Sequence, residues 1–219
     1  MRSSYRLELA LRRALPEGAK VWLRAARLLT QPAPPAAPEV PQALLDGAQL
    51  VTNRIEMLRR LPRGGRVAEL GTLYGDFAHH ILTICAPDRL HIVDIHLSNC
   101  RRDVLDHPAV EAEQAMTTDW LPRFPDAHFD WIYVDADHGY EAVKADIAAA
   151  APKVRPGGFL VFNDYARMLR PGLGVFGVHQ AVTEFIVAAR WPVAFLALQG
   201  EALYDIALRR PSAGEEADA

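Results

Sequence analysis

The sequence is short of cysteine, of long apolar runs and of net charge. Its two cysteines, Cys85 and Cys100, stand far apart, which excludes a disulfide framework and a cysteine-based metal site. Cys85 lies in an apolar stretch and is expected to be a buried free thiol, which predicts a reducing, cytoplasmic setting. No apolar run approaches the ~20 residues that a membrane span needs, and no signal-peptide pattern is visible.

The small net charge limits the class of partner. A formal net charge of −3 over 219 residues gives no general reason to expect nucleic acid. Half of the residues are hydrophobic, which is enough for one domain with a full core and an appendage.

The first part of the chain differs in composition from the rest. Residues 1–28 hold seven basic and two acidic side chains, and Leu7, Leu11 and Leu15 recur at the spacing of an amphipathic helix. Such a helix either touches an anionic membrane or partner, or packs on the domain or on a second copy of the chain. We favour the second interpretation, which makes a homo-oligomer through this arm an option. The prolines of residues 31–41 predict a stiff linker.

The sequence therefore divides into three parts: the arm and linker (1–41), one folded domain (42–211) and a small, acidic tail expected to be disordered (212–219). The domain is expected to open with a helix over residues 42–61. Apolar residues recur there every three or four positions, and a proline follows. Those apolar residues are Leu44, Ala48, Val51, Ile55 and Leu58.

Beyond this helix, apolar β-forming runs alternate with helical patterns, which is typical of parallel βαβ units. The last two runs are joined by residues 199–201, a link so short that it permits only an antiparallel pair. The sequence predicts an α/β fold with a doubly wound, seven-stranded sheet and an antiparallel last strand. The expected strands are Arg66–Leu70, Leu90–Asp94, Glu113–Met116, Asp130–Val134, Gly158–Phe162, Val193–Leu198 and Ala202–Leu208.

A cluster of polar residues follows the apolar strand that ends at Val134. Asp135, Asp137 and His138 come within four residues, where a central strand delivers side chains into the ligand crevice of an open α/β sheet. Carboxylates and an imidazole are costly to desolvate there, so they need a metal ion, a substrate proton or each other. The alternative is that the two aspartates have only structural roles, one as a helix cap and one in a turn, where the helix from Tyr140 begins.

The end of the first strand indicates a nucleotide-like ligand. Gly71 lets a ligand approach the backbone, and Gly75 opens a helix whose amide dipoles face the crevice. The spacing differs from the G-x-G-x-x-G dinucleotide fingerprint. Asp94 ends the second strand, where an acid can accept both hydroxyls of a ribose or, alternatively, cap a helix. Together these signals favour an adenosine-containing ligand.

These motifs resemble those of class I S-adenosylmethionine-dependent methyltransferases over roughly residues 42–209. The resemblance implies a Rossmann-like sheet and S-adenosylmethionine as the cofactor, with Asp94 on the ribose. The family often carries an acid near the adenine after the third strand, and Thr117 or Asp119 stands in that region; Asp119 could instead cap a helix. The remaining cofactor residues implied are Glu69, Gly71, Thr72, Tyr74, Gly75 and Asp135.

Three further stretches, residues 134–147, 155–165 and 177–185, resemble macrocin O-methyltransferase and, more distantly, the catechol O-methyltransferases. In those enzymes an acid after the fourth strand and two residues after the fifth hold a divalent metal. The matching positions are Asp135, Asn163 and Asp164, whose oxygen donors suit Mg²⁺ or Mn²⁺. The alternative for Asn163 and Asp164 is a loop turn.

His138 stands where the catechol enzymes carry a catalytic lysine and some sugar enzymes a histidine. The resemblance makes His138 the general base, with Asp137 as its orienting partner or as a rival base. An imidazole pKa of about 6.5 suits proton abstraction near neutral pH. The expected function is Mg-dependent O-methylation of a small-molecule hydroxyl, on a sugar or catechol-like natural product. The alternatives are a metal-independent methyltransferase and a non-catalytic binding module on the same fold.

Overall fold

The computed structural model describes residues 36–166, 169–170, 174–200 and 203–212. The helix expected around Leu7, Leu11 and Leu15 and nearly all of the tail expected over 212–219 lie outside the described residues.

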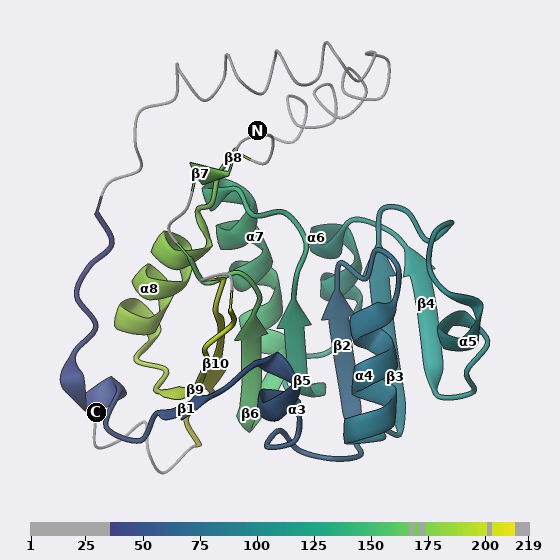
Figure 1. The fold of residues 1–219 in the computed structure, drawn as a ribbon, viewed down its shortest axis with the longest axis horizontal. Coiled ribbons are helices and arrows are strands. Elements are labelled where there is room, and N and C mark those ends of the chain that lie inside the picture. The colour runs from purple at the N-terminus through teal and green to yellow at the C-terminus, as the bar shows by residue number, and fades with distance from the viewer. Residues whose placement is uncertain (1–35, 167–168, 171–173, 201–202, 213–219) are drawn as a thin grey trace.

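One sheet organises the described chain. Its strands are β1 (Gln49–Val51), β2 (Arg66–Leu70), β3 (Arg89–Asp94), β4 (Val110–Gln114), β5 (Phe129–Val134), β6 (Val154–Phe162), β9 (Val193–Ala197) and β10 (Asp205–Arg209). They lie in the order β1-β9-β10-β6-β5-β2-β3-β4 (Figure 1). Neighbours from β6 to β4 are parallel, whereas β10 is antiparallel to both β6 and β9. The predicted doubly wound sheet with an antiparallel last strand is confirmed.

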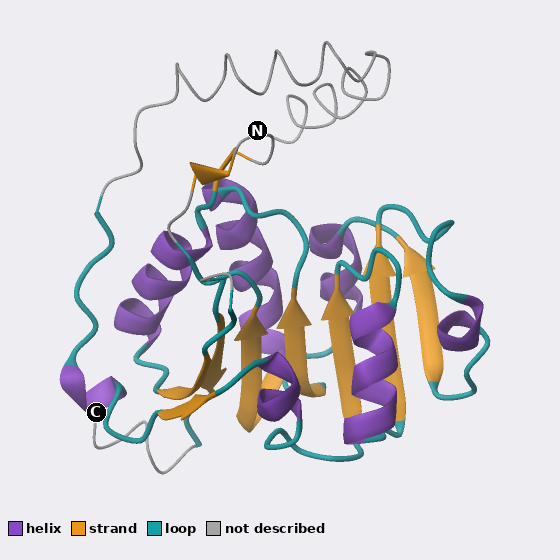
Figure 2. Cartoon of the chain, in the orientation of Figure 1, coloured by secondary structure: helices purple, strands orange, loops and turns teal. Residues whose placement is uncertain are grey.

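Helices cover both faces of this sheet (Figure 2). One face carries α3 (Arg54–Leu58), α4 (Asp76–Cys85) and α5 (Arg102–Leu105). The other face carries α6 (Thr117–Trp120), α7 (Tyr140–Ala150) and α8 (Val178–Ala189). Shorter elements are the 3-10 turns η1 (Gln42–Leu44), η2 (Leu121–Arg123) and η3 (Ala151–Lys153), and a hairpin of β7 (Leu169–Arg170) with β8 (Gly174–Val175).

The alternation of side chains along each strand divides the interior into two cores. In β5, Trp131 and Tyr133 point to the α4 side, while Ile132 and Val134 point to the α7 side. All four are buried, which explains why the sequence of this strand is apolar throughout. Glu69 and Tyr133 pair across β2 and β5, so they share the α4 side. The polar residues that follow these strands are thus supported from both faces.

The predicted helix over residues 42–61 is wrong. The chain instead forms η1, then β1, then α3, and β1 adds an eighth strand by pairing parallel with β9. Leu44 packs in the core on the α7 side, whereas Val51 and Leu58 pack in the core on the α4 side. The helix-like spacing therefore arises because the chain passes the edge of the sheet and buries side chains in two different cores.

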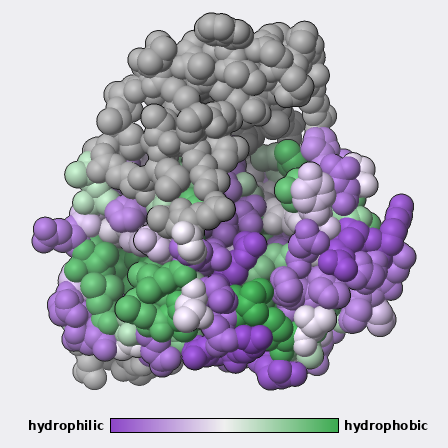
Figure 3. Space-filling model, viewed as in Figure 1, coloured by the Kyte–Doolittle hydropathy of each residue, from purple (hydrophilic) through white to green (hydrophobic). Residues whose placement is uncertain are grey.

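The third predicted strand is displaced. β4 covers Val110–Gln114 rather than Glu113–Met116, and most of its side chains are exposed or half-buried. An edge strand with so little burial carries a weak apolar signal. On the face drawn in Figure 3, hydrophilic surface dominates the β4 side and hydrophobic surface gathers at the lower left, towards β1 and β9. None of the described helices has the length and apolar character to cross a membrane. Both cysteines are free and buried, as predicted for Cys85.

Candidate active site

The carboxyl ends of the central strands meet at one edge of the sheet. The backbone ladder continues one residue beyond each strand: Gly71 N donates to Val93 O at 2.8 Å and Asp135 N to Leu70 O at 2.8 Å. Asn163 N likewise donates to Val134 O at 3.0 Å. Gly71, Asp135 and Asn163 therefore lie side by side, in the crevice where open α/β sheets bind ligands.

Gly71 is required by the close approach of two loops. Its φ is +85°, and a Cβ on this residue would lie 2.1 Å from the carbonyl oxygen of Asp135. No larger residue fits there without moving the backbone of one loop. The glycine predicted to admit a ligand thus also brings the loop after β2 against the loop after β5.

Asp94 shapes the loop that follows β2. Its Oδ2 accepts hydrogen bonds from the backbone amides of Thr72 at 3.0 Å and Leu73 at 2.9 Å, and its Oδ1 accepts from His96 N at 2.9 Å. Leu73 has a φ of 47°, a left-handed conformation that these bonds help to hold. The predicted ribose acid is therefore in the crevice, and it also orders the predicted cofactor loop.

Glu69 is buried beneath the same loop. The Thr72 hydroxyl donates to its carboxylate at 2.6 Å. Burial raises the pKa of Glu69 to about 8, against the opposing effect of the Thr72 hydrogen bond. With this pKa, Glu69 is mainly neutral at pH 7.

A second loop, residues 97–103, closes over Gly75 at the start of α4. Gly75 has a φ of +78°, and a Cβ there would lie 2.7 Å from Cys100 Sγ. Arg101 N donates to Tyr74 O at 3.0 Å. The cofactor loop is thus held by contacts from the segment that follows β3.

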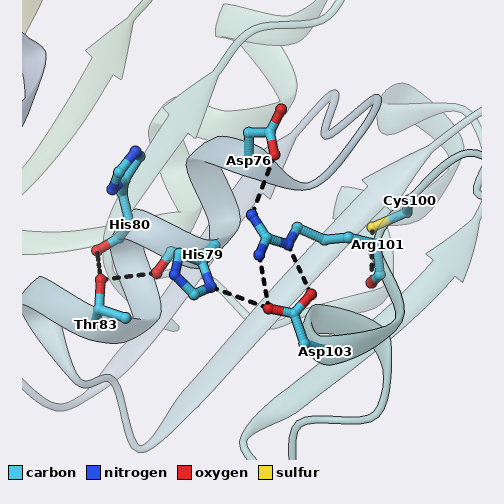
Figure 4. A network of polar contacts seen from close by, with 7 residues as sticks. All are labelled: Asp76, His79, His80, Thr83, Cys100, Arg101 and Asp103. Atoms are coloured by element: carbon cyan, nitrogen blue, oxygen red, sulfur yellow. Dashed lines mark hydrogen bonds and ion pairs between the residues drawn. The ribbon is translucent and has the colours of Figure 1, made fainter.

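Side chains extend this contact on the surface, as Figure 4 shows. Arg101 donates through Nε to Asp103 Oδ1 at 2.7 Å and through Nη1 to Asp76 Oδ1 at 3.2 Å. His79 Nδ1 lies 3.3 Å from Asp103 Oδ2. These exposed pairs join α4 to α5 and position the loop, although such surface ion pairs add little to stability. These pairs could not be predicted from the sequence because their partners lie on different elements.

Three large apolar side chains are exposed beside these loops. Leu73 is 57% exposed, Tyr74 is 55% exposed and Ile95, which follows Asp94, is 39% exposed. Exposed apolar groups next to a polar crevice are typical of a ligand-binding surface. Tyr74, a predicted cofactor residue, thus stands at the rim rather than within the crevice.

Thr117 and Asp119 lie in α6, beyond β4. Ala115 N donates to Asp94 O at 3.0 Å, which brings this segment next to the predicted ribose acid. Thr117 is buried, and its hydroxyl forms a hydrogen bond with Asp146 of α7. Asp119 is exposed. The Thr117 side chain therefore lies in the interior, and its hydroxyl is already hydrogen-bonded.

His138 lies between the two predicted metal-binding carboxylates. Its Nε2 is 3.2 Å from Asp164 Oδ2 and 3.6 Å from Asp135 Oδ1. This nitrogen is buried and forms no well-directed hydrogen bond with any described residue. Burial lowers the pKa of His138, but the carboxylates of Asp164 and Asp135 outweigh it and the pKa is raised.

The ring of His138 is held from the α8 side. It stacks on the ring of Phe176 with centroids 4.8 Å apart, and Gly177 N donates to His138 O at 2.8 Å. A Cβ on Gly177 would lie 2.4 Å from Tyr140 Cα, so this contact also requires glycine. The predicted catalytic histidine is positioned by residues that the sequence analysis did not connect with it.

Asn163 is oriented by a buried acid that the sequence analysis missed. Asp205 of β10 accepts from Asn163 Nδ2 at 3.1 Å, Gln199 Nε2 at 2.7 Å and Tyr133 Oη at 2.6 Å. Because the amide nitrogen of Asn163 donates to Asp205, its amide oxygen is the atom left to accept, and Asn163 helps to raise the pKa of His138. The available signal was an acid at the start of an otherwise apolar strand.

Asp137 lies in a different environment from His138. Its Oδ1 accepts from Gly139 N at 2.7 Å, in the turn that opens α7, and the residue is exposed. This is the turn position that the sequence analysis kept as an alternative. Asp137 still lines a small pocket together with Asp135, His138 and Asn163.

The donor set suits a hard divalent ion. Asp135 and Asp164 have carboxylate oxygens and Asn163 has an amide oxygen, and the buried Nε2 of His138 lies between the two acids. Oxygen donors of this kind are those that Mg²⁺ and Mn²⁺ prefer. Among the described residues, however, no three His, Cys, Asp or Glu side chains are grouped closely enough to hold a metal by themselves.

Part of the chain matches a known family of protein domains. Residues 68–165, from β2 to the loop after β6, match a family model described as a methyltransferase domain. No curated protein sequence matches the chain. The match identifies a methyltransferase domain within the chain.

Solved structures show the same fold. The N-methyltransferase NodS from Bradyrhizobium japonicum WM9, in complex with S-adenosyl-L-homocysteine, has a TM-score of 0.58 at 16% identity, covering 88% of this chain and 100% of that chain. The 1,6-didemethyltoxoflavin-N1-methyltransferase from Burkholderia thailandensis has a TM-score of 0.55 at 13% identity, covering 72% of this chain and 76% of that chain. An O-methyltransferase family protein from Burkholderia thailandensis has a TM-score of 0.55 at 15% identity; 73% of this chain covers only 56% of that chain.

Proposed function

We propose that this chain is an S-adenosylmethionine-dependent O-methyltransferase that acts on a hydroxyl of a small molecule with the aid of Mg²⁺ or Mn²⁺. The observation that carries the proposal is the position of His138 Nε2 between the carboxylates of Asp135 and Asp164. A base and two hard ligands thereby share one crevice with the cofactor loop. In this proposal the catalytic domain spans residues 42–211, and the acceptor is a sugar or a catechol-like compound with adjacent oxygens.

The cofactor would lie along the loop after β2. Asp94 would accept hydrogen bonds from the ribose hydroxyls, and Leu73, Tyr74 and Ile95 would offer apolar surface to the adenosine. Glu69, beneath Gly71 and Thr72, would face the ammonium group of the methionine part. When bound, the cofactor supplies a methyl group on a sulfonium centre.

The acceptor would be held by the polar residues after β5 and β6. Asp135, Asp164 and the amide oxygen of Asn163 would hold a divalent ion, which when bound lowers the pKa of a coordinated hydroxyl. Nε2 of His138 would take the proton of the acceptor hydroxyl, while Phe176 and Gly177 keep the imidazole in place. Alignment of the acceptor oxygen with the methyl group is mainly a proximity effect. Asp137 would hold the turn that carries His138.

A metal-independent methyltransferase is the second candidate, and the same contact favours it. A protonated imidazole between two carboxylates already neutralises part of their charge, as a metal ion would. Asp135 and Asp164 would then orient His138 rather than bind metal.

Two measurements test the proposal in sequence. Calorimetry should first show S-adenosylhomocysteine binding to the full chain, and its absence would remove methyl transfer as the function. The chain should then transfer an isotope-labelled methyl group from S-adenosylmethionine to members of a panel of sugars and catechols. Binding without transfer to any hydroxyl compound, together with transfer to an amine panel, would replace O-methylation by N-methylation.

A further inference from the structure

Arg54 reaches the α4 side of the crevice from the first residue of α3. Its Cζ lies 4.8 Å from the centroid of the Phe77 ring, and the Phe77 ring packs 4.2 Å from that of Tyr133. The guanidinium is half-buried above an aromatic pair that rests on the central strand β5. A cation stacked on an aromatic ring is held in place without using its hydrogen-bond donors.

Acidic groups surround this arginine, yet no described carboxylate forms an ion pair with it. Burial raises the pKa values of Glu69, Asp135 and Asp205, and the positive charge of Arg54 opposes the rise in all three. These acids come from β2, the loop after β5 and β10. The positive charge of Arg54 therefore acts electrostatically on acids from three separate elements of the crevice.

Arg54 has more N–H donors than there are acceptor atoms near it among the described residues. Tyr133 is its polar neighbour, and the Tyr133 hydroxyl donates its proton to Asp205, which leaves only the phenol oxygen to accept. A guanidinium carries five N–H donors in a planar fork that matches a carboxylate. The remaining donors can serve an anion that enters the crevice.

Arg54 and Glu69 together match an α-amino acid. The first is a permanent cation, and the second is a buried acid that becomes an anion when an ammonium group approaches it. Both lie on the α4 side, since Glu69 and Tyr133 are register partners in β2 and β5. A zwitterion would place its carboxylate at Arg54 and its ammonium group towards Glu69.

We propose that Arg54 binds the α-carboxylate of the methionine part of the cofactor. The inference rests on the proposed function, because that function supplies a ligand with an amino acid group. It makes α3 part of the cofactor site and gives Arg54 a role in positioning the sulfonium. In the competing account, Arg54 only packs on Phe77 and supports the fold.

Ligands that differ only in the amino acid group separate the two accounts. Calorimetry would use S-adenosylhomocysteine, its decarboxylated analogue and 5′-methylthioadenosine, with the full chain and with Arg54→Gln. The substitution should weaken S-adenosylhomocysteine binding about 10–100-fold, the effect of losing hydrogen bonds to a charged group. Binding of the decarboxylated analogue should change less than about twofold.

Two further variants keep the test decisive. Arg60→Gln removes an exposed arginine just after α3, which pairs with Glu56, and should leave the affinity for all three ligands unchanged. Arg54→Lys keeps the charge without the fork and should give an intermediate loss for S-adenosylhomocysteine alone. Equal weakening of all three ligands by either Arg54 variant, or no weakening, would overturn the role of Arg54. Failure of the unaltered chain to bind any of the three would instead refute the proposed function, and the inference with it.

Discussion

Nε2 of His138 lies 3.2 Å from Oδ2 of Asp164, although the two residues follow different strands of the sheet. Asp164 adopts a left-handed conformation, with a φ of 53°, that aspartate tolerates better than most residues. The contact joins the loop after β5 to the loop after β6. It therefore couples the proposed base to a proposed metal ligand.

Replacing His138 by alanine should lower kcat about 10²–10⁴-fold, the usual contribution of a general base. The affinity for S-adenosylhomocysteine should not change, because His138 lies on the acceptor side of the crevice. Steady-state methyl transfer and calorimetry on the same preparation measure the two effects. His80→Ala, an exposed histidine of α4, is the matched control and should keep full activity.

Asp137→Asn distinguishes the two candidate bases. Its oxygen can still accept from Gly139 N, so the turn that opens α7 should persist and activity should fall only slightly. If Asp137→Asn abolishes methyl transfer while His138→Ala is nearly fully active, Asp137 is the base and our assignment is wrong.

Asp94→Ala should weaken S-adenosylhomocysteine binding by about 1–3 kcal/mol, because ligand hydroxyls and the amides of Thr72 and Leu73 lose a charged acceptor. Calorimetry at constant pH measures the change. Asp106→Ala, an exposed position after α5, should bind as tightly as the unaltered chain. An Asp94→Ala variant with unchanged affinity would place the ribose elsewhere.

The affinity for S-adenosylhomocysteine should rise with pH up to about 8. Burial raises the pKa of unliganded Glu69 to about 8, and a bound ammonium group would favour its ionised form, so binding releases a proton below that pH. Calorimetry in buffers of different ionisation enthalpy measures the proton count. Glu69→Gln should release less proton and flatten the pH dependence between 6 and 8; an identical profile would show that another group titrates.

Asp146→Asn should change the pH dependence of stability. Burial raises the pKa of Asp146 to about 6, against the hydrogen bond from Thr117, whereas an unfolded aspartate has a pKa of about 3.9. The native state thus holds a proton that the unfolded state has lost, and the wild-type free energy of unfolding falls between about pH 4 and 6. The variant keeps an oxygen for Thr117 and avoids this loss, about 2–3 kcal/mol. Urea unfolding from pH 4 to 7 measures the difference, and parallel curves would contradict it.

The central strands and their polar ends could be predicted from the sequence because each signal is local. Trp131 to Val134 are apolar on both sides of the strand, and Asp135 follows directly, so topology alone brings it beside Gly71 and Asn163. Parallel strands make this inference reliable, since their carboxyl ends share one edge of the sheet.

The first elements of the domain could not be predicted in the same way. β1 has three residues, and its pairing with β9 depends on a partner more than a hundred residues away. One local signal was available: Asn53 stands three residues before Glu56, and its Oδ1 accepts from Glu56 N at 3.0 Å as the cap of α3. Arg54 follows that cap, and only the packing of α3 on α4 reveals its contact with Phe77.

The most direct test of the account measures transfer of an isotope-labelled methyl group from S-adenosylmethionine to a catechol or sugar acceptor after dialysis against a chelator. The account predicts that the stripped chain is inactive, that Mg²⁺ or Mn²⁺ restores transfer, and that Asp135→Asn and Asp164→Asn are not restored. The unaltered chain and Asp164→Asn should bind S-adenosylhomocysteine alike, which controls for folding. Full transfer by the chelator-treated chain would contradict the metal role and leave His138 between two carboxylates that only orient it.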